Sequence, residues 1–85
     1  MDNEFVGMWL SADHQVRKML LPNGRFIAML GGDIRHQGEY RIRDRRIVAY
    51  YKDGTLLGEG EFIDGVLHGG PVALYAEGYE ELVAA

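Results

Sequence analysis

The 85-residue chain contains no cysteine, one tryptophan, one serine and only two prolines. Without cysteine there is no disulfide framework, no thiolate nucleophile and no zinc site built on cysteine. Because Ser11 is the only serine, no Ser-His-Asp arrangement can be assigned. Twelve glycines against two prolines suit many tight turns between short elements.

The sequence also lacks long apolar runs and an excess of positive charge. No stretch approaches the ~20 apolar residues of a membrane-spanning helix. Asp2 and Glu4 stand where a secretory signal has basic residues, so we expect a cytoplasmic protein without a membrane partner. The net charge of −4 argues against a general nucleic-acid binder, because phosphate contacts need positive charge. The length predicts one domain over residues 1–77, followed by a tail over 78–85.

The clearest pattern is the alternation of apolar and polar residues in short runs that turn signals separate. Asp-Gly between two such runs indicates a two-residue hairpin turn, because both turn positions need positive φ. We therefore predict an all-β fold, a small antiparallel up-and-down barrel of about eight short strands. The strands are expected at residues 5–11, 14–22, 25–32, 34–43, 46–52, 55–63, from 66 onward, and 72–75.

Two-residue turns at 44–45 and 53–54 decide which side chains face the barrel interior, because a shift of one residue exchanges the two faces of a strand. The predicted inner face contains Gly38, Tyr40, Ile42, Ile47, Ala49, Tyr51, Leu56, Gly58, Gly60 and Phe62. An inner glycine marks a bend, a close backbone approach or room for a ligand, and these alternatives stay open. At Asp64-Gly65, a two-residue turn points Leu67 inward and His68 outward, whereas a longer loop reverses them.

The hairpin around Asn23-Gly24 has apolar residues on both faces. A two-residue turn there leaves Leu20, Ile27 and Met29 on the outer side. Polar residues are expected on a face that meets water, so a cover is predicted, either a partner subunit or the C-terminal tail. The predicted partner is a second copy of the chain, in a homodimer through these three residues. Single exposed apolar residues are the alternative.

Charged residues and histidines indicate neither a nucleic-acid nor a metal site. The arginines of the predicted strand 34–43 alternate to the outer face, and a cross-strand pair of Arg46 with Glu61 suits a solvated sheet. His14, His36 and His68 do not have the spacing of metal ligands. We predict no metal, no cofactor and no nucleic-acid partner.

Gly7-Met8-Trp9 on the first predicted strand resembles the Gly-x-Trp motif of lipocalins and avidins, whose tryptophan plugs one barrel end. Further motifs follow it in order: Gly38-Glu39-Tyr40, Arg45-Arg46-Ile47, Asp53-Gly54, Gly58-Glu59-Gly60-Glu61-Phe62 and Asp64-Gly65-Val66-Leu67-His68-Gly69-Gly70. Together they resemble, over residues 7–75, a family of small bacterial proteins with a streptavidin-like, lipocalin-like barrel, first defined from an Agrobacterium protein. The resemblance implies a short-stranded barrel with a small-ligand cavity and no assigned reaction. The biotin-binding residues of avidins have no counterparts here.

The leading functional prediction is binding of an unidentified small molecule inside the barrel. Inner glycines beside inner tyrosines would form a compact cavity with a hydroxyl directed at the ligand. The predicted ligand-binding residues are Trp9, His36, Tyr40, Tyr51 and Phe62. Two alternatives stay open. One is a non-catalytic oligomerisation or interaction module, and the other is a small barrel cyclase or isomerase whose proton carrier is His36, Tyr40 or Tyr51.

Overall fold

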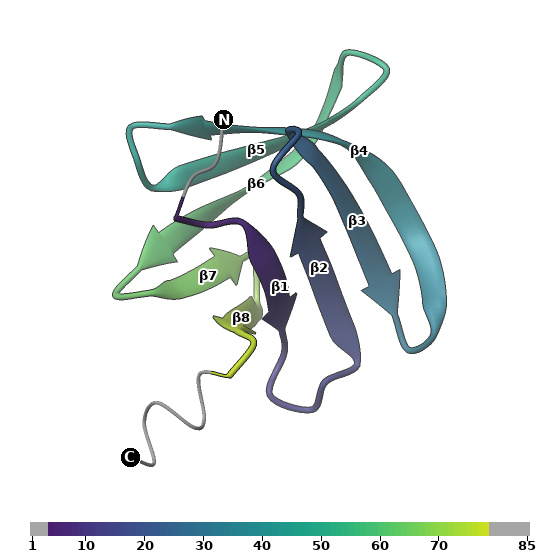
Figure 1. Ribbon diagram of the computed structural model, residues 1–85, viewed down its shortest axis with the longest axis vertical. Helices are drawn as coiled ribbons and strands as arrows, with labels where there is room; N and C mark the ends of the chain where they lie inside the picture. The colour runs from purple at the N-terminus through teal and green to yellow at the C-terminus, as the bar shows by residue number, and fades with distance from the viewer. Residues whose placement is uncertain (1–3, 79–85) are drawn as a thin grey trace.

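A computed structural model describes residues 4–78, which form eight strands and no helix. The strands are β1 (Gly7–Leu10), β2 (Val16–Leu20), β3 (Arg25–Leu30), β4 (Asp33–Arg43), β5 (Ile47–Lys52), β6 (Thr55–Ile63), β7 (Val66–Gly69) and β8 (Val72–Ala76). They follow one another in chain order round a closed antiparallel barrel (Figure 1), which β1 and β8 close by pairing. The predicted all-β barrel of eight short strands is confirmed.

Residue 79 and the rest of the predicted C-terminal tail lie outside the described residues. Within residues 4–78, no helix is long and apolar enough to cross a membrane.

The turns at 53–54 and 64–65 have the predicted chemistry. Their φ angles are 52° and 80° in the first and 52° and 81° in the second. Positive φ at both positions is the property of the turn whose twist matches paired strands. At the second turn Phe62 pairs with Leu67, so Leu67 is buried and His68 is exposed. Of the two alternatives for this hairpin, the two-residue turn is the correct one.

Strand β5 has its two faces exchanged relative to the prediction. The turn at 44–45 is present, but Arg46 is an extra residue before pairing with β4 resumes. Tyr40 therefore lies opposite Tyr50 and not opposite Ala49. The prediction that Ile47 and Tyr51 face the interior is wrong, and Val48 and Tyr50 join the core instead. Ala49 is completely buried, as a core residue would be, but it pairs with Arg41 and Glu59 on the outer side of the strand.

A bulge in β6 restores the predicted faces beyond it. Tyr51 pairs with Leu56 and Tyr50 pairs with Gly58, so Leu57 is the extra residue. Leu56, predicted inside, is 51% exposed because it precedes the bulge and shares the outer face with Tyr51. From Gly58 onward the inner positions of β6 are those predicted. The two irregularities, one on each side of β5, compensate each other.

The first hairpin is also shifted by one residue from the prediction. Pro22 has φ near −65° and suits the second position of a turn that begins at Leu21. The backbone O of Leu21 accepts the N–H of Gly24 at 3.2 Å, and positive φ is needed only at Gly24. Leu20 then pairs with Phe26 and is completely buried. The prediction that Leu20 lies on the outer face is wrong.

Aromatic rings fill the barrel beside the start of β1. The indole N–H of Trp9 donates to the backbone O of Phe5 at 2.9 Å. Phe62 lies between the two residues, with its ring centroid 3.7 Å from that of Phe5 and 5.2 Å from that of Trp9. Trp9 is therefore buried, at 6% exposed, in an aromatic cluster with Phe5 and Phe62. The buried cluster as a whole consists of Trp9, Leu20, Phe26, Tyr40, Val48, Tyr50, Phe62, Leu67 and Leu74.

The three inner glycines have different roles. A Cβ at Gly38 would collide with the backbone O of Tyr51. A Cβ at Gly60 would stand 2.9 Å from Cδ1 of Leu67. At Gly58, by contrast, no atom lies within 4 Å of the position a Cβ would take. Close packing therefore requires glycine at two of these positions, and the third, Gly58, borders open space.

Candidate functional site

A cavity of about 310 Å³ lies beside Gly58, and we call it the mouth cavity. Six consecutive strands, β2 to β7, contribute to its wall, which runs from the inner-face residues Phe26 and Tyr50 to the exposed residues His36, Leu57 and Glu59, where the cavity opens to solvent. Its lining residues are Lys18, Phe26, Ala28, His36, Tyr50, Leu57, Gly58, Glu59 and Gly69. Small-molecule sites begin at about 300 Å³, so the mouth cavity has the volume of a site for a small ligand.

Lys18 brings a positive charge to the wall of the mouth cavity. It precedes Leu20 by two residues on β2, and this spacing puts both side chains on the inner face. Its Nζ lies 3.9 Å from the ring centroid of Tyr50, on the opposite side of the barrel, which is a cation–π contact. No carboxylate within residues 4–78 forms an ion pair with Lys18. Burial lowers the pKa of Lys18, because the ammonium loses part of its hydration.

Tyr50 contributes a buried hydroxyl that no other described residue satisfies. Its ring contacts Phe26 edge to face, with centroids 4.9 Å apart. The hydroxyl has no hydrogen-bond partner in the part of the chain that the structure describes. Burial raises the pKa of Tyr50, because the phenolate would lose its hydration. An unsatisfied buried hydroxyl costs about 1–3 kcal/mol, so this group does not serve the stability of the free barrel.

The remaining wall is mostly apolar or backbone. Glu59 is the acidic residue of the lining, and it is already in an ion pair with Arg43. His36 pairs with Ala28 across the β3–β4 ladder and is exposed at the rim. A molecule that enters the mouth cavity therefore meets one ammonium, one imidazole, one carboxylate that is already in an ion pair, an apolar wall and glycine backbone.

Of the five predicted ligand-binding residues, His36 is the one that lines the mouth cavity. Trp9 and Phe62 belong to the aromatic cluster beside the start of β1. The Tyr40 hydroxyl donates to the backbone O of Leu21 at 2.7 Å, so its hydrogen is already used. Of the three proton carriers named for the cyclase or isomerase alternative, His36 lines the mouth cavity, and that alternative stays a prediction. A ligand role for the predicted set stays a prediction.

Lys18 and Tyr50 are the site residues that sequence reasoning missed. Tyr50 was missed because the register predicted for β5 was wrong by one residue, and Tyr51, predicted in its place, lies on the outer face. Lys18 was missed because the register predicted for the first hairpin was also wrong by one residue. Pro22 is the signal that would have recovered it, because a turn beginning one residue before proline turns Lys18 inward together with Leu20.

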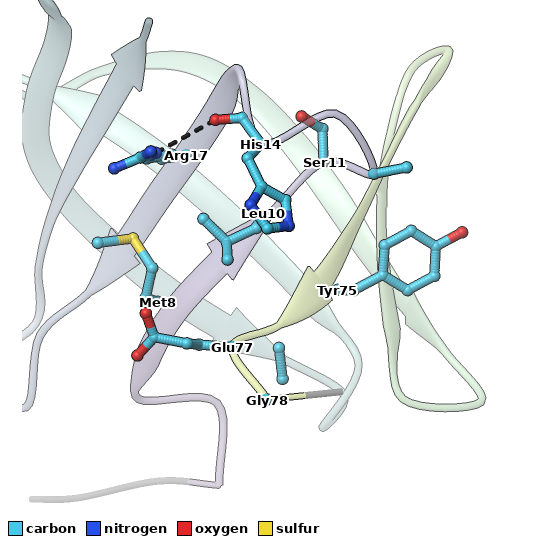
Figure 2. A pocket seen from close by; sticks show the side chains of 10 residues that line it. Met8, Leu10, Ser11, His14, Arg17, Tyr75, Glu77 and Gly78 are labelled. Carbon is cyan, nitrogen blue, oxygen red and sulfur yellow. Dashed lines mark hydrogen bonds between the residues drawn. The ribbon is translucent and has the colours of Figure 1, made fainter. Parts of the chain in front are cut away.

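A second hollow lies on the outer surface over β1, β2 and β8. Figure 2 shows Arg17 on one side of it and Tyr75 on the other, with His14 between them. Several of its polar side chains already have partners: Arg17 Nε donates to His14 O at 3.2 Å, and Ser11 Oγ lies 2.6 Å from Asp13 Oδ1. His14 and Tyr75 have partners as well. Its volume, about 310 Å³, equals that of the mouth cavity, but it lies on the outer surface of the sheet.

The outer face of β2 and β3 keeps two of the three residues predicted for a homodimer. Ile27 lies opposite Met19, and Met29 lies opposite Arg17. Ile27 and Met29 are already half-buried within the single chain, and Leu20 belongs to the core. A homodimer through this face stays a prediction, and Leu20 is no longer part of its surface.

The fold and the mouth cavity together define a class, the small closed antiparallel barrel with a hollow interior at one end. Within that class the chain belongs to the family described as Agrobacterium tumefaciens protein Atu4866, whose model matches residues 2–76. The solution structure of the protein Atu4866 from Agrobacterium tumefaciens is similar, with a TM-score of 0.73 and 35% sequence identity. The similarity covers 91% of this chain and 99% of that one. No match was found among curated proteins.

The family membership confirms the resemblance inferred from the sequence motifs. Neither the family description nor the similar structure names an activity, a ligand or a partner. The function therefore has to be argued from the site.

Proposed function

We propose that this protein binds a small molecule in the mouth cavity of the barrel. One observation carries the proposal: an interior volume of about 310 Å³ coincides with a charged side chain that no described residue neutralises. Binding sites are mostly apolar clefts with a few convergent polar groups, and the mouth cavity has that composition. Lys18 is the principal polar group, with Phe26 and Ala28 in the apolar wall.

The absence of a side chain at Gly58 also supports the proposal. A glycine in a strand weakens the strand unless a bend, a close approach or a ligand needs it. Close approach accounts for Gly38 and Gly60, whereas the space beside Gly58 is open. A side chain at this position would occupy the volume that the ligand needs. The glycine therefore serves the cavity and not the packing of the barrel.

The volume also limits the ligand. A water molecule takes about 30 Å³ of liquid, so the cavity corresponds to roughly ten waters. A ligand of that size has on the order of ten heavy atoms. At about 0.3 kcal/mol per heavy atom, ten atoms give about 3 kcal/mol and a millimolar dissociation constant, whereas the ceiling of about 1.5 kcal/mol per atom gives about 15 kcal/mol and a dissociation constant below nanomolar.

The test is native mass spectrometry of the protein purified from its own host, on wild type, Gly58→Leu and Gly32→Leu. Gly32 is the matched control, because it is also unconfined at Cβ but lies in an exposed turn away from the cavity. The proposal predicts a retained small mass on wild type and Gly32→Leu that Gly58→Leu has lost. If the same mass remains on the folded Gly58→Leu protein, the mouth cavity is not the binding site.

A further inference from the structure

We infer that the ligand of the mouth cavity is a small organic carboxylate whose charged end pairs with the ammonium of Lys18. This inference rests on the proposed function and adds the chemical class of the ligand. It assigns the apolar body of the ligand to the wall formed by Phe26, Ala28 and Leu57.

Charge is the first reason for this ligand class. Lys18 is partly withdrawn from water, and among residues 4–78 its partner is the face of an aromatic ring. Glu59, the acidic residue of the lining, is in an ion pair with Arg43. A cationic ligand would add a second unpaired positive charge, and a neutral ligand would leave the first one without a counter-ion. An anionic ligand completes the site.

Hydrogen bonding is the second reason. Lys18 offers N–H donors and no acceptor. A carboxylate accepts several hydrogen bonds on its two oxygens, so it suits a group that only donates. Nζ lies 3.9 Å from the centroid of the Tyr50 ring, and this contact leaves its N–H groups without an oxygen acceptor from the ring.

Shape is the third reason, and it concerns the rest of the ligand. Gly58 and Gly69 line the cavity without side chains, and no atom lies within 4 Å of a Cβ built on either. The opposite wall has Phe26, in edge-to-face contact with Tyr50. A compact apolar group, either a single ring or a short branched chain, suits a space between backbone and an aromatic wall.

The experiment is a titration of the full chain, followed by amide chemical shifts, with matched pairs of probes. The pairs are benzoate with benzamide, and cyclohexanecarboxylate with its amide. Within a pair the apolar body is constant and only the charge of the head group changes. Charge-assisted hydrogen bonds contribute more than neutral ones, so each carboxylate is expected to bind about tenfold or more tightly than its amide.

Two lysine variants test whether Lys18 causes the preference for the carboxylate over the amide. In Lys18→Met the preference for the carboxylate is expected to disappear, with the amide binding as in wild type. Lys52→Met is the control, because Lys52 is exposed at the end of β5 and does not line the cavity. Lys52→Met also removes one positive charge, and this variant is expected to keep the preference for the carboxylate. A Lys18→Met protein that still prefers carboxylates by the same factor overturns the inference.

The outcomes also separate this inference from the proposed function. If carboxylates and amides bind equally well, and Gly58→Leu abolishes both, the cavity binds ligands but the carboxylate class is wrong. If no probe of either kind binds wild type and the host protein retains no small mass, both the ligand class and the proposed function are wrong.

Discussion

The most informative single change is Tyr50→Phe, measured beside Tyr40→Phe. The two tyrosines lie opposite each other on β5 and β4 and are 5% and 6% exposed. They differ in what the hydroxyl meets. The Tyr40 hydroxyl donates to the backbone O of Leu21 at 2.7 Å, whereas the Tyr50 hydroxyl has no partner among residues 4–78. The same chemical change should therefore alter stability in opposite directions.

The magnitudes follow from the cost of burying a hydroxyl. A satisfied hydrogen bond contributes about 1 kcal/mol, so Tyr40→Phe should lower the free energy of unfolding by roughly that amount. An unsatisfied buried hydroxyl costs about 1–3 kcal/mol, so Tyr50→Phe should raise the free energy of unfolding by about 1 kcal/mol or more. In a domain of this size, 1 kcal/mol corresponds to about 4–8 °C in Tm.

The assay is urea and thermal unfolding of both variants and wild type, followed by circular dichroism at pH 7. The protein is first unfolded and refolded to remove any bound molecule. If Tyr50→Phe is less stable than wild type by as much as Tyr40→Phe, the Tyr50 hydroxyl has a hydrogen-bond partner in the free protein. The statement that Tyr50 buries an unsatisfied hydroxyl would then be refuted.

Three further predictions concern other positions. Burial lowers the pKa of Lys18 below 10.5, so between the lowered pKa and pH 10.5 the unfolded chain holds a proton that the folded protein has lost. The free energy of unfolding of wild type should therefore rise as the pH rises toward 10.5, and urea titrations of Lys18→Met should lack that rise. Gly38→Ala forces Cβ against the backbone O of Tyr51 and should lower the free energy of unfolding by about 3 kcal/mol, whereas unfolding of Gly32→Ala should match wild type within about 0.5 kcal/mol. The predicted homodimer requires sedimentation velocity to show a dimer for wild type and a monomer for folded Ile27→Lys; a wild-type monomer at high concentration contradicts it.

Strand number and barrel class could be predicted because turn chemistry is local. Asp-Gly at 53–54 and 64–65 specifies positive φ at two adjacent positions, and both turns form as expected. The face of β5 could not be predicted in the same way. Residues 47–51 are apolar without interruption, so no alternation distinguishes one register from the other. Only packing against β4 and β6 selects Val48 and Tyr50 as the inner pair.

The candidate site was less predictable than the fold. His36 was identified because it lies on a strand whose faces were assigned correctly. Lys18 and Tyr50 meet across the barrel from β2 and β5, and both strands were assigned with a shift of one residue. Contacts across a barrel depend on every register between the two strands. An error of one residue in a single hairpin is enough to hide them.

We propose the mouth cavity, and not the outer hollow of Figure 2, as the binding site. The most direct test is amide chemical-shift mapping of wild type with a mixture of small fragments. The account predicts saturable shifts at Lys18, Tyr50 and Gly58. Saturable shifts confined to the neighbourhood of Arg17 and Tyr75, or no saturable shifts at all, would contradict it.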